Sequence, residues 1–403
     1  MCPVIFHIDV NSAYLSWSAV HMLSKGYPTD LRTVDAAVGG DTSKRRGVIL
    51  AKSIPAKRYH VRTGEPVTDA LKKCPHLLLI PPDHDLYRQF SQEMRKILAE
   101  YSDDIRPYSI DECFMVYRPF PGDDHSPVKA AHIIRQRIFN ELGFTVNVGI
   151  STNFLLAKMA SDFEKPNRVH TLFPEEIPEK MWPLPVEDLF MVGHAAAARL
   201  ELLGIRTIGE LAHTDPNILY AHLKSHGRTI WEYANGIEKS PVETRTQAAK
   251  GIGHSTTLSA DVTSVSEASQ VLLELAKKVS LRLRAARLFA GMVSVEIKYS
   301  DFRSFSHQKQ LPEAVQDPAI LHQTGMELFN ELWTGQPIRL LGLRTSKLSD
   351  APVHQMDLFE AASHIRHQKL DKALDAIRQK YGDSAIIRGS SLTSPSENDK
   401  RDD

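Results

Sequence analysis

The chain has 403 residues, of which 42% are hydrophobic and 24% are charged, and its 49 basic and 49 acidic side chains give a formal net charge of zero. This length predicts two to four globular domains, and the zero net charge argues against a protein that holds nucleic acid by bulk charge alone. No apolar run is long enough to cross a bilayer, the amino terminus MCPVIFHIDV lacks the basic region of a signal peptide, and three scattered cysteines form no metal-ligand spacing; together these features predict a cytoplasmic protein with reduced thiols and no membrane association.

The first 150 residues predict a split βαβ unit, with a segment of about fifty to sixty residues inserted after its first strand. The expected elements, in chain order, are a strand at 4–10, a helix capped by Asn11 or Ser12 and ending near Lys25, a helix at 86–101, strands at 105–110 and 113–117, a helix capped by Ser126, and a strand at 144–150.

Prolines between residues 166 and 178 indicate a boundary, after which residues 189–212 predict two short helix–turn–helix pieces joined at Gly193 and Gly204. Beyond a linker at about 237–250 the same order of elements returns, so a second unit with the topology of the first is expected. Its expected elements are a strand at 254–260, a helix capped by Ser264 and Glu267, strands at 291–299 and 303–311, a helix at 318–333 and a strand at 338–347. The polar end, TSPSENDKRDD, has the composition of a disordered segment.

Three carboxylates are expected to meet at one end of the first sheet. Asp9 ends the first strand, and Asp111 and Glu112 lie at the junction of the second and third. In a split βαβ sheet the first and third strands are central neighbours, so Asp9 faces this junction across one strand spacing. Carboxylates gathered in this way repel one another unless cations neutralise them, and their hard oxygens suit Mg²⁺. Two such ions about 4 Å apart support in-line phosphoryl transfer.

The residues alone leave two other interpretations open. A pair such as Asp111 and Glu112 is also what a solvated turn contains, and Asp9 is also placed to cap a helix. The combination of all three on one predicted fold, with a basic segment nearby, favours a site.

Four stretches resemble the Y-family DNA polymerases, the DinB/UmuC group. They are HIDVNSAYLSW at 7–17, YSIDECF at 108–114, VNVGISTNFLLAKMASDFEKPN at 146–167 and LFMVGHAAAARLELLGIRTIGEL at 189–211. The resemblance runs over about residues 4–348, and the stretches come in the family order. The residues DVN at 9–11 and AK at 56–57 are more similar to the UmuC-like branch than to the DinB branch.

The resemblance implies an α+β multidomain fold shaped like a right hand, with a ferredoxin-like palm, small fingers, a helical helix–hairpin–helix thumb and a βαββαβ little-finger domain. The domains it implies are a catalytic palm at 1–14 and 83–172, fingers at 15–82, a thumb at 173–240, a little finger at 245–348 and a tail with a clamp-binding peptide at 349–403.

The resemblance also implies an activity: low-fidelity, template-directed DNA synthesis across lesions, as part of DNA repair and the DNA damage response. It would add dNMP to a primer 3′-hydroxyl with two Mg²⁺ ions, release pyrophosphate and lack proofreading. Asp9, Asp111 and Glu112 would be the catalytic residues and metal ligands, with the Val10 carbonyl completing one ligand shell.

For the nucleotide, the resemblance places Tyr14 as a steric gate against the 2′-hydroxyl, Ala13 beside it, and Lys165 and Lys57 on the triphosphate. The chain departs from the DinB pattern in having Lys57 and Ile54 where that branch has an arginine and a tyrosine. This departure puts nucleotide affinity in doubt, and Lys52 is a candidate to compensate for it.

For DNA, the resemblance places Gly193 of the thumb turn, although MVGHA has one glycine where such turns usually have two. Lys298, Arg303 and Arg344 fall on expected strands of the little finger. The peptide QMDLF at 355–359 fits the motif that grips a bacterial sliding clamp, through Gln355, Leu358 and Phe359. The expected partners are primer–template DNA, dNTP, the clamp and possible accessory proteins, and the expected state is a monomer near the nucleoid.

A second hypothesis is a non-catalytic module that binds DNA and the clamp at stalled forks, against which the intact Asp9, Asp111 and Glu112 argue. A palm-based nucleotidyl cyclase is disfavoured by the expected thumb, little finger and clamp peptide.

Overall fold

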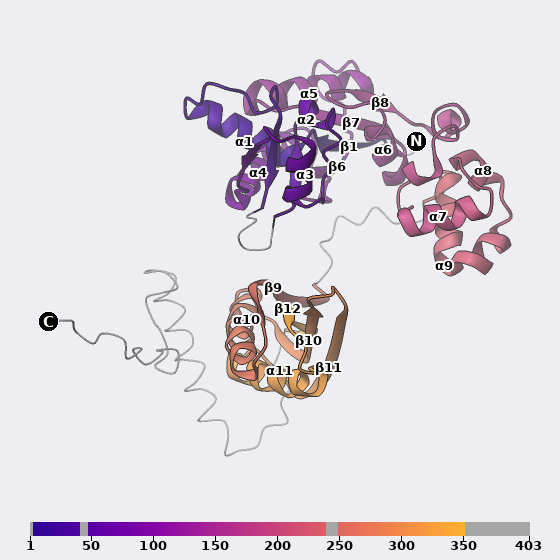
Figure 1. The fold of residues 1–403 in the computed structure, drawn as a ribbon. Helices are drawn as coiled ribbons and strands as arrows, with labels where there is room; N and C mark the ends of the chain where they lie inside the picture. Colours follow the sequence, from indigo (N-terminus) through magenta and orange to yellow (C-terminus); the bar gives the residue numbers. More distant parts are fainter. Residues whose placement is uncertain (1–2, 41–46, 239–248, 351–403) are drawn as a thin grey trace. The chain divides into compact units, whose positions relative to one another are not determined.

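The computed structural model describes residues 3–40, 47–238 and 249–350, which Figure 1 draws in colour. The chain divides into two compact units, Met1–Thr246 and Gln247–Asp403. The division falls within the linker expected between the thumb and the little finger. None of the helices in the described ranges is both long enough and apolar enough to span a bilayer.

A five-stranded sheet in the order β5-β6-β1-β7-β8 forms the centre of the first unit. Its strands are β1 (Ile5–Val10), β5 (Ile105–Pro107), β6 (Glu112–Val116), β7 (Val146–Ser151) and β8 (Val169–Thr171). Strand β1 pairs antiparallel with both β6 and β7, so the predicted split βαβ order is confirmed. All six residues of β1 are buried, as befits the central strand of a covered sheet.

Helices cover this sheet, and the expected cap Ser126 is confirmed. Helix α4 (His84–Ala99) starts after Asp83 and α5 (Pro127–Leu142) after Ser126, whose hydroxyl accepts a hydrogen bond from the Lys129 N–H. Helix α1 (Ala13–Ser24) is different: Ser12 has a left-handed backbone and its side chain makes no capping hydrogen bond, so the expected serine cap is wrong. Instead the Asn11 carbonyl accepts from the Ser16 hydroxyl at 2.6 Å.

Helix α6 (Phe154–Ser161) packs unusually close to β7, and Gly149 permits this approach. A Cβ atom on Gly149 would lie 2.0 Å from the Ala157 carbonyl oxygen and 2.4 Å from the Ser161 nitrogen. Both contacts are with backbone, which cannot rotate away, so alanine would push α6 off the sheet.

We therefore expect Gly149→Ala to lower the free energy of unfolding by about 3 kcal/mol. Urea denaturation followed by circular dichroism measures this change. The matched control is Gly193→Ala, because Gly193 has ordinary backbone angles and no atom within 4 Å of an added Cβ. Equal stability of the two variants would show that α6 does not need this close approach.

The inserted segment forms a small sheet in the order β3-β2-β4, flanked by two short helices. Its elements are β2 (Ala36–Gly39), β3 (Ile49–Lys52), α2 (Ile54–Lys57), α3 (Val67–Lys73) and β4 (Leu78–Ile80). The helical region after β8 has α7 (His194–Leu202), α8 (Ile208–His213) and α9 (Pro216–Ala234), preceded by short turns at Pro174–Glu176, Ile177–Met181 and Val186–Asp188. Helices α7 and α8 match the two expected helical pieces.

The second unit contains β9 (Gly251–Val262), α10 (Val265–Ala286), β10 (Phe289–Tyr299), β11 (Ser304–Val315), α11 (Pro318–Leu332) and β12 (Ile338–Ser349). The element order is as expected, but the sheet order is β11-β10-β12-β9, so the expected repeat of the first topology is wrong. The first strand is central in the first unit and lies at the edge in the second. Burial gives the reason: β1 is buried throughout, whereas β9 buries only Ile252 and Val262.

Both helices of the second unit pack on one face of its sheet. Val293, Val295 and Ile297 of β10 point into that core, while Ser294 and Glu296 alternate onto the other face. Arg303 was expected on a strand and instead lies in the turn before β11, where its Nε bonds the Asp301 carboxylate at 2.6 Å. An aspartate two residues before the arginine favours such a turn.

Candidate active site

The ends of β1 and β6 bring the three predicted carboxylate residues together. Asp9 stands opposite Glu112 in the strand register. The Val10 N–H donates to the Asp111 carbonyl at 3.1 Å, which fixes the turn against the end of β1. Asp9 is buried, Asp111 and Glu112 are half-buried, and the Asp111 carboxylate accepts from the Ser109 hydroxyl at 2.5 Å.

Two lysines neutralise the inner carboxylates. The Lys158 ammonium lies 2.8 Å from Glu112, and the Lys165 ammonium bonds both Asp9 and, at 2.8 Å, Asp162. Each ammonium therefore supplies the positive charge that its carboxylate partners need, because ionised groups in a poorly solvated site require a counter-charge.

Burial raises the pKa of Asp9 to about 6, against the opposing effect of Lys165. Burial alone would lower the pKa of Lys165, but the charges of Asp9 and Asp162 raise it to about 12. The pKa of Asp9 rises because burial removes the water that would stabilise its charged form. The pKa of Lys165 rises because two carboxylates lie beside its ammonium. The site thus holds an anion that water no longer stabilises.

His7, two residues before Asp9, provides a further buried polar group beside Glu112. Its Nδ1 shares a 2.7 Å hydrogen bond with the Ser161 hydroxyl, while its Nε2 lies 3.9 Å from the Glu112 carboxylate and has no hydrogen-bond partner among the described residues. Burial, together with Lys158 and Lys165, lowers the pKa of His7 well below its usual value, so the ring is neutral.

These observations fit divalent cations. The available donors are hard carboxylate oxygens at the ends of two paired strands, and two ammonium groups already bind them. In addition, the buried His7 Nε2 faces the Glu112 carboxylate without a hydrogen-bond partner among the described residues.

A buried amide network holds the loop that carries Lys165. The Asn11 side chain accepts from the Asn167 N–H at 2.9 Å and donates to Asn147 at 3.2 Å, and Asn147 donates to the Glu164 carbonyl at 2.9 Å. Asn11 therefore positions the loop that carries Lys165.

Tyr14 lies at the start of α1, directly after the buried Ala13. Its ring stacks on Tyr87 with 4.6 Å between centroids and an interplanar angle of 10°. Burial and the charge of Asp111 raise the pKa of the Tyr14 hydroxyl. The ring is thus held by this stack, with its hydroxyl within electrostatic range of the Asp111 carboxylate.

In the inserted segment, Lys57 ends α2 and is exposed, as is Ile54. The pKa of Lys52 is lowered by burial and then by the nearby charge of Lys57. Lys52 and Lys57 therefore form a local basic group, an arrangement that favours an anionic ligand.

Sequence reasoning missed Lys158. This lysine is buried, and its ammonium also lies over the rings of Tyr108 and Phe190, 5.3 and 5.6 Å from their centroids. The signal was present: Lys158 is the one charged residue in the mainly apolar stretch FLLAKMAS that forms α6. Such a lysine requires a partner.

The expected DNA contacts lie in separate places. Gly193 is the residue before α7, whose first N–H groups it leaves open. Lys298 on β10 and Arg344 on β12 stand on the uncovered face of the second sheet, opposite Leu340 and Ser294. The peptide with Gln355, Leu358 and Phe359 lies outside the described residues.

Comparison with known proteins gives the class of the fold. A solved structure titled Y-family DNA polymerase chimera Dbh-Dpo4(243-245)-Dbh superposes with a TM-score of 0.73, covering 86% of this chain and 99% of that chain at 19% sequence identity. The chain therefore has the predicted fold class, an α+β multidomain right-hand polymerase fold with palm, fingers, thumb and little finger.

The impB/mucB/samB family model matches residues 8–162, its C-terminal domain matches 249–358, and its helix–hairpin–helix motif matches 174–205. A protein called DNA polymerase IV from Clostridium acetobutylicum is 49% identical over 96% of this chain and 98% of its own length. One of the same name from Clostridium kluyveri is 36% identical over 99% of this chain and 100% of its own length. The chain belongs to this family, the Y-family DNA polymerases. These relatives are DinB-like, and the closer likeness to the UmuC-like branch is not confirmed.

Proposed function

We propose that the chain is a DNA-directed DNA polymerase that copies damaged templates and thereby serves DNA repair. The observation that carries this proposal is the meeting of Asp9, Asp111 and Glu112 at the ends of two paired central strands. Relatives named DNA polymerase IV, which match nearly the whole chain, support the same activity. The described palm, fingers, thumb and little finger include no further domain for an exonuclease, so we propose low fidelity without proofreading.

Divalent cations would be held by Asp9 and Asp111 together, with Glu112 and the Val10 carbonyl completing the ligands; we propose two Mg²⁺ ions. Such ions would supply Lewis-acid chemistry there, favouring deprotonation of the primer 3′-hydroxyl and departure of pyrophosphate. Lys158 orients the Glu112 carboxylate through its 2.8 Å contact. Lys165 now bonds the Asp9 carboxylate, and a cation held by Asp9 would take the place of that ammonium, leaving Lys165 for the triphosphate.

We therefore expect Lys165→Ala to raise the KM for dNTP at least about tenfold, because a point charge on the triphosphate is lost. Steady-state single-nucleotide insertion measures this effect. Arg168→Ala is the matched control, since Arg168 is exposed on the same loop and pairs with Glu164. An equal KM in the two variants would remove Lys165 from the nucleotide site.

The rest of the nucleotide site is proposed from fewer observations. Tyr14 and Ala13 begin α1 beside Asp111, and Lys57, with Lys52 beside it, supplies positive charge from the fingers. Lys57 is a point charge and cannot bind phosphate with the bidentate geometry of arginine, so we propose a comparatively weak hold on the triphosphate.

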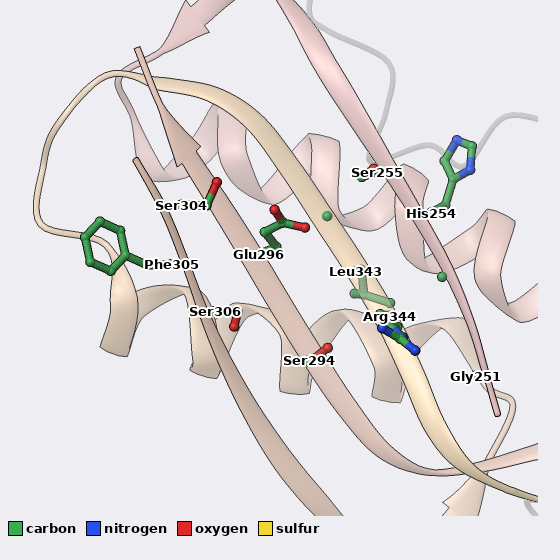
Figure 2. Close-up of a pocket in the computed structure, with 12 residues that line it drawn as sticks. Gly251, His254, Ser255, Ser294, Glu296, Ser304, Phe305, Ser306, Leu343 and Arg344 are labelled. Atoms are coloured by element: carbon green, nitrogen blue, oxygen red, sulfur yellow. The ribbon is translucent and has the colours of Figure 1, made fainter. Parts of the chain in front are cut away.

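The uncovered face of the second sheet is the proposed DNA surface of the little finger. Figure 2 shows Arg344, Ser294, Glu296 and Ser255 on this face, with the helices behind the sheet. Arg344 lies against Gly253, where an added Cβ would be 3.0 Å from the arginine Cβ. Hydroxyls and glycines let a phosphate backbone approach, whereas Glu296 repels it, so we propose that Arg344 and Lys298 make the contacts. Arg303 is already paired with Asp301 and contributes less.

Gly193 and the first N–H groups of α7 are proposed to hold a DNA phosphate in the thumb. We further propose that QMDLF binds a sliding clamp through Gln355, Leu358 and Phe359. Tethering raises the local concentration of a protein whose net charge is zero and whose own affinity for DNA is therefore modest. A monomer in the cytoplasm, at the nucleoid and with accessory proteins, fits this role.

A further inference from the structure

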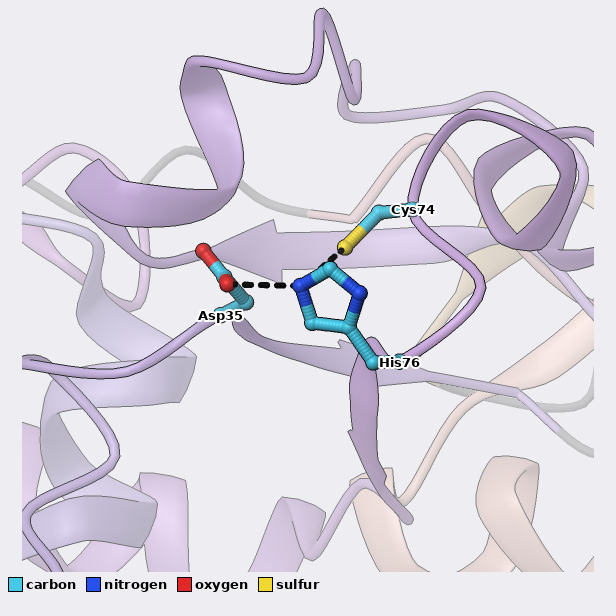
Figure 3. Close-up of side chains that lie close together, drawn as sticks. All are labelled: Asp35, Cys74 and His76. Carbon is cyan, nitrogen blue, oxygen red and sulfur yellow. Dashed lines mark hydrogen bonds and ion pairs between the residues drawn. The ribbon is translucent and has the colours of Figure 1, made fainter.

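Three residues of the fingers meet at one edge of the small sheet, and one of them, Asp35, is 41 residues from His76 in the sequence. Asp35 lies directly before β2, Cys74 ends α3, and His76 lies two residues before β4. Strands β2 and β4 are parallel neighbours, and the Leu78 N–H donates to the Asp35 carbonyl at 2.9 Å. The three side chains therefore project from adjoining segments at the same end of two paired strands (Figure 3).

Both partners of His76 point at the same ring nitrogen. A carboxylate oxygen of Asp35 lies 2.9 Å from Nε2, and the Cys74 sulfur lies 3.7 Å from that same atom. All three ligand atoms lie within 4.8 Å of one another, and no other such group occurs within 3–40, 47–238 and 249–350. A relay for a nucleophilic cysteine needs the carboxylate on the opposite ring nitrogen, so this geometry does not activate a thiol.

The separations suit a small cation. With a metal at about 2.0 to 2.3 Å from each ligand in a tetrahedron, nitrogen and sulfur would be about 3.6 Å apart and oxygen and nitrogen about 3.3 Å apart. The observed 3.7 Å already fits the first value, and 2.9 Å requires only a small outward movement of Asp35 or His76. The side chain of His76 is 60% exposed and free to make this movement.

The surroundings fix the sulfur ligand. Cys74 is fully buried and packs in the core of the fingers, with Ala70 and Leu77, so its sulfur has little freedom. The Tyr59 ring meets the His76 ring edge-on at 5.3 Å. The fourth position of a tetrahedron would face solvent on the side of the exposed histidine.

We propose that Asp35, Cys74 and His76 bind a Zn²⁺ ion in the fingers, separately from the catalytic carboxylates. A thiolate and an imidazole select zinc over Mg²⁺, which prefers oxygen ligands alone. On binding, the thiol proton of Cys74 passes to solvent, and the imidazole proton resides on Nδ1 so that Nε2 is open to the metal. The ion would join the start of β2, the end of α3 and the approach to β4, and so stabilise the fingers.

The test uses the full-length, metal-free protein and Co²⁺ as a spectroscopic substitute for zinc. Titration should produce a sulfur-to-cobalt charge-transfer band in the near ultraviolet that saturates at one ion per chain and disappears when Zn²⁺ is added. The palm carboxylates contain no sulfur, so cobalt bound there gives no such band.

Cys74→Ser should abolish the band and His76→Gln should weaken cobalt binding at least about tenfold, whereas Cys113→Ser, a buried thiol elsewhere, should leave both unchanged. His76 is exposed, so its variant tests the site even if Cys74→Ser folds poorly. The variant Asp111→Ala/Glu112→Gln should retain the band, which separates this site from polymerase activity. Absence of the band in the parent protein, or its persistence in Cys74→Ser, overturns the proposal.

Discussion

Replacing Asp111 by alanine and Glu112 by glutamine is expected to abolish primer extension, with a loss of at least about 1,000-fold in rate. Both side chains would hold the cations on which phosphoryl transfer depends. Glutamine is preferred at position 112 because Lys158 is buried, and alanine there would leave its ammonium without a hydrogen-bond acceptor. Extension of a labelled primer on a template, with dNTPs and Mg²⁺, is the measurement.

The matched control is Asp103→Ala, because Asp103 is an exposed carboxylate a few residues before β5 and away from the junction. It should extend primers like the parent. Each reaction is run with and without a bacterial sliding clamp, and extension that depends on the clamp would support the role of QMDLF. No extension in any lane, with primer–template binding intact, would favour the non-catalytic module or a missing accessory protein. Extension that survives the double substitution would contradict the site.

Removing the ring of Tyr14 is expected to have the second large effect, a loss of discrimination between dNTP and NTP. Tyr14→Ala should admit ribonucleotides, lowering the preference for dNTP over NTP by about 100-fold, or about 2.7 kcal/mol in transition-state energy. The expected reason is steric: the ring is held by its stack on Tyr87 and would block the space that a 2′-hydroxyl needs. Insertion of one nucleotide, compared between dNTP and NTP by kcat/KM, measures the change.

Tyr14→Phe is the control, since it keeps the ring and loses only the hydroxyl beside Asp111. This variant should retain the parent preference for dNTP. If Tyr14→Ala discriminates as well as Tyr14→Phe does, the gate lies elsewhere. If both variants admit ribonucleotides, the hydroxyl rather than the ring makes the selection.

Local patterns were sufficient for most of the elements. The apolar period of residues 86–101 predicted α4, whose Met94 and Ile97 are buried as expected. Ser126 and Ser264 were predicted as caps, and both accept the hydrogen bonds that the pattern requires. These features succeed because a helix period and a cap depend on residues only a few positions apart.

The pairing of strands was less accessible from sequence. The two units share an element order and differ in sheet order, because the burial available to β1 and β9 decides which of them is central. Arg303 was predicted to lie on a strand, but it lies in a turn in which its guanidinium bonds Asp301. Such outcomes depend on partners that a local pattern does not contain.

The sequence by itself determined the family and the order of the elements. It also determined that Asp9 lies near Asp111 and Glu112, because a strand end and a hairpin junction follow from local chemistry and the topology of a split βαβ sheet. Only the tertiary structure decided which cations stand against those carboxylates, and that Asp35, Cys74 and His76 share one corner. Lys158 lies 46 residues from Glu112, and His76 lies 41 from Asp35. Contacts between residues so far apart follow from how whole elements pack, since the strength of an ion pair or a metal site depends on separations of a few ångströms that no local pattern specifies.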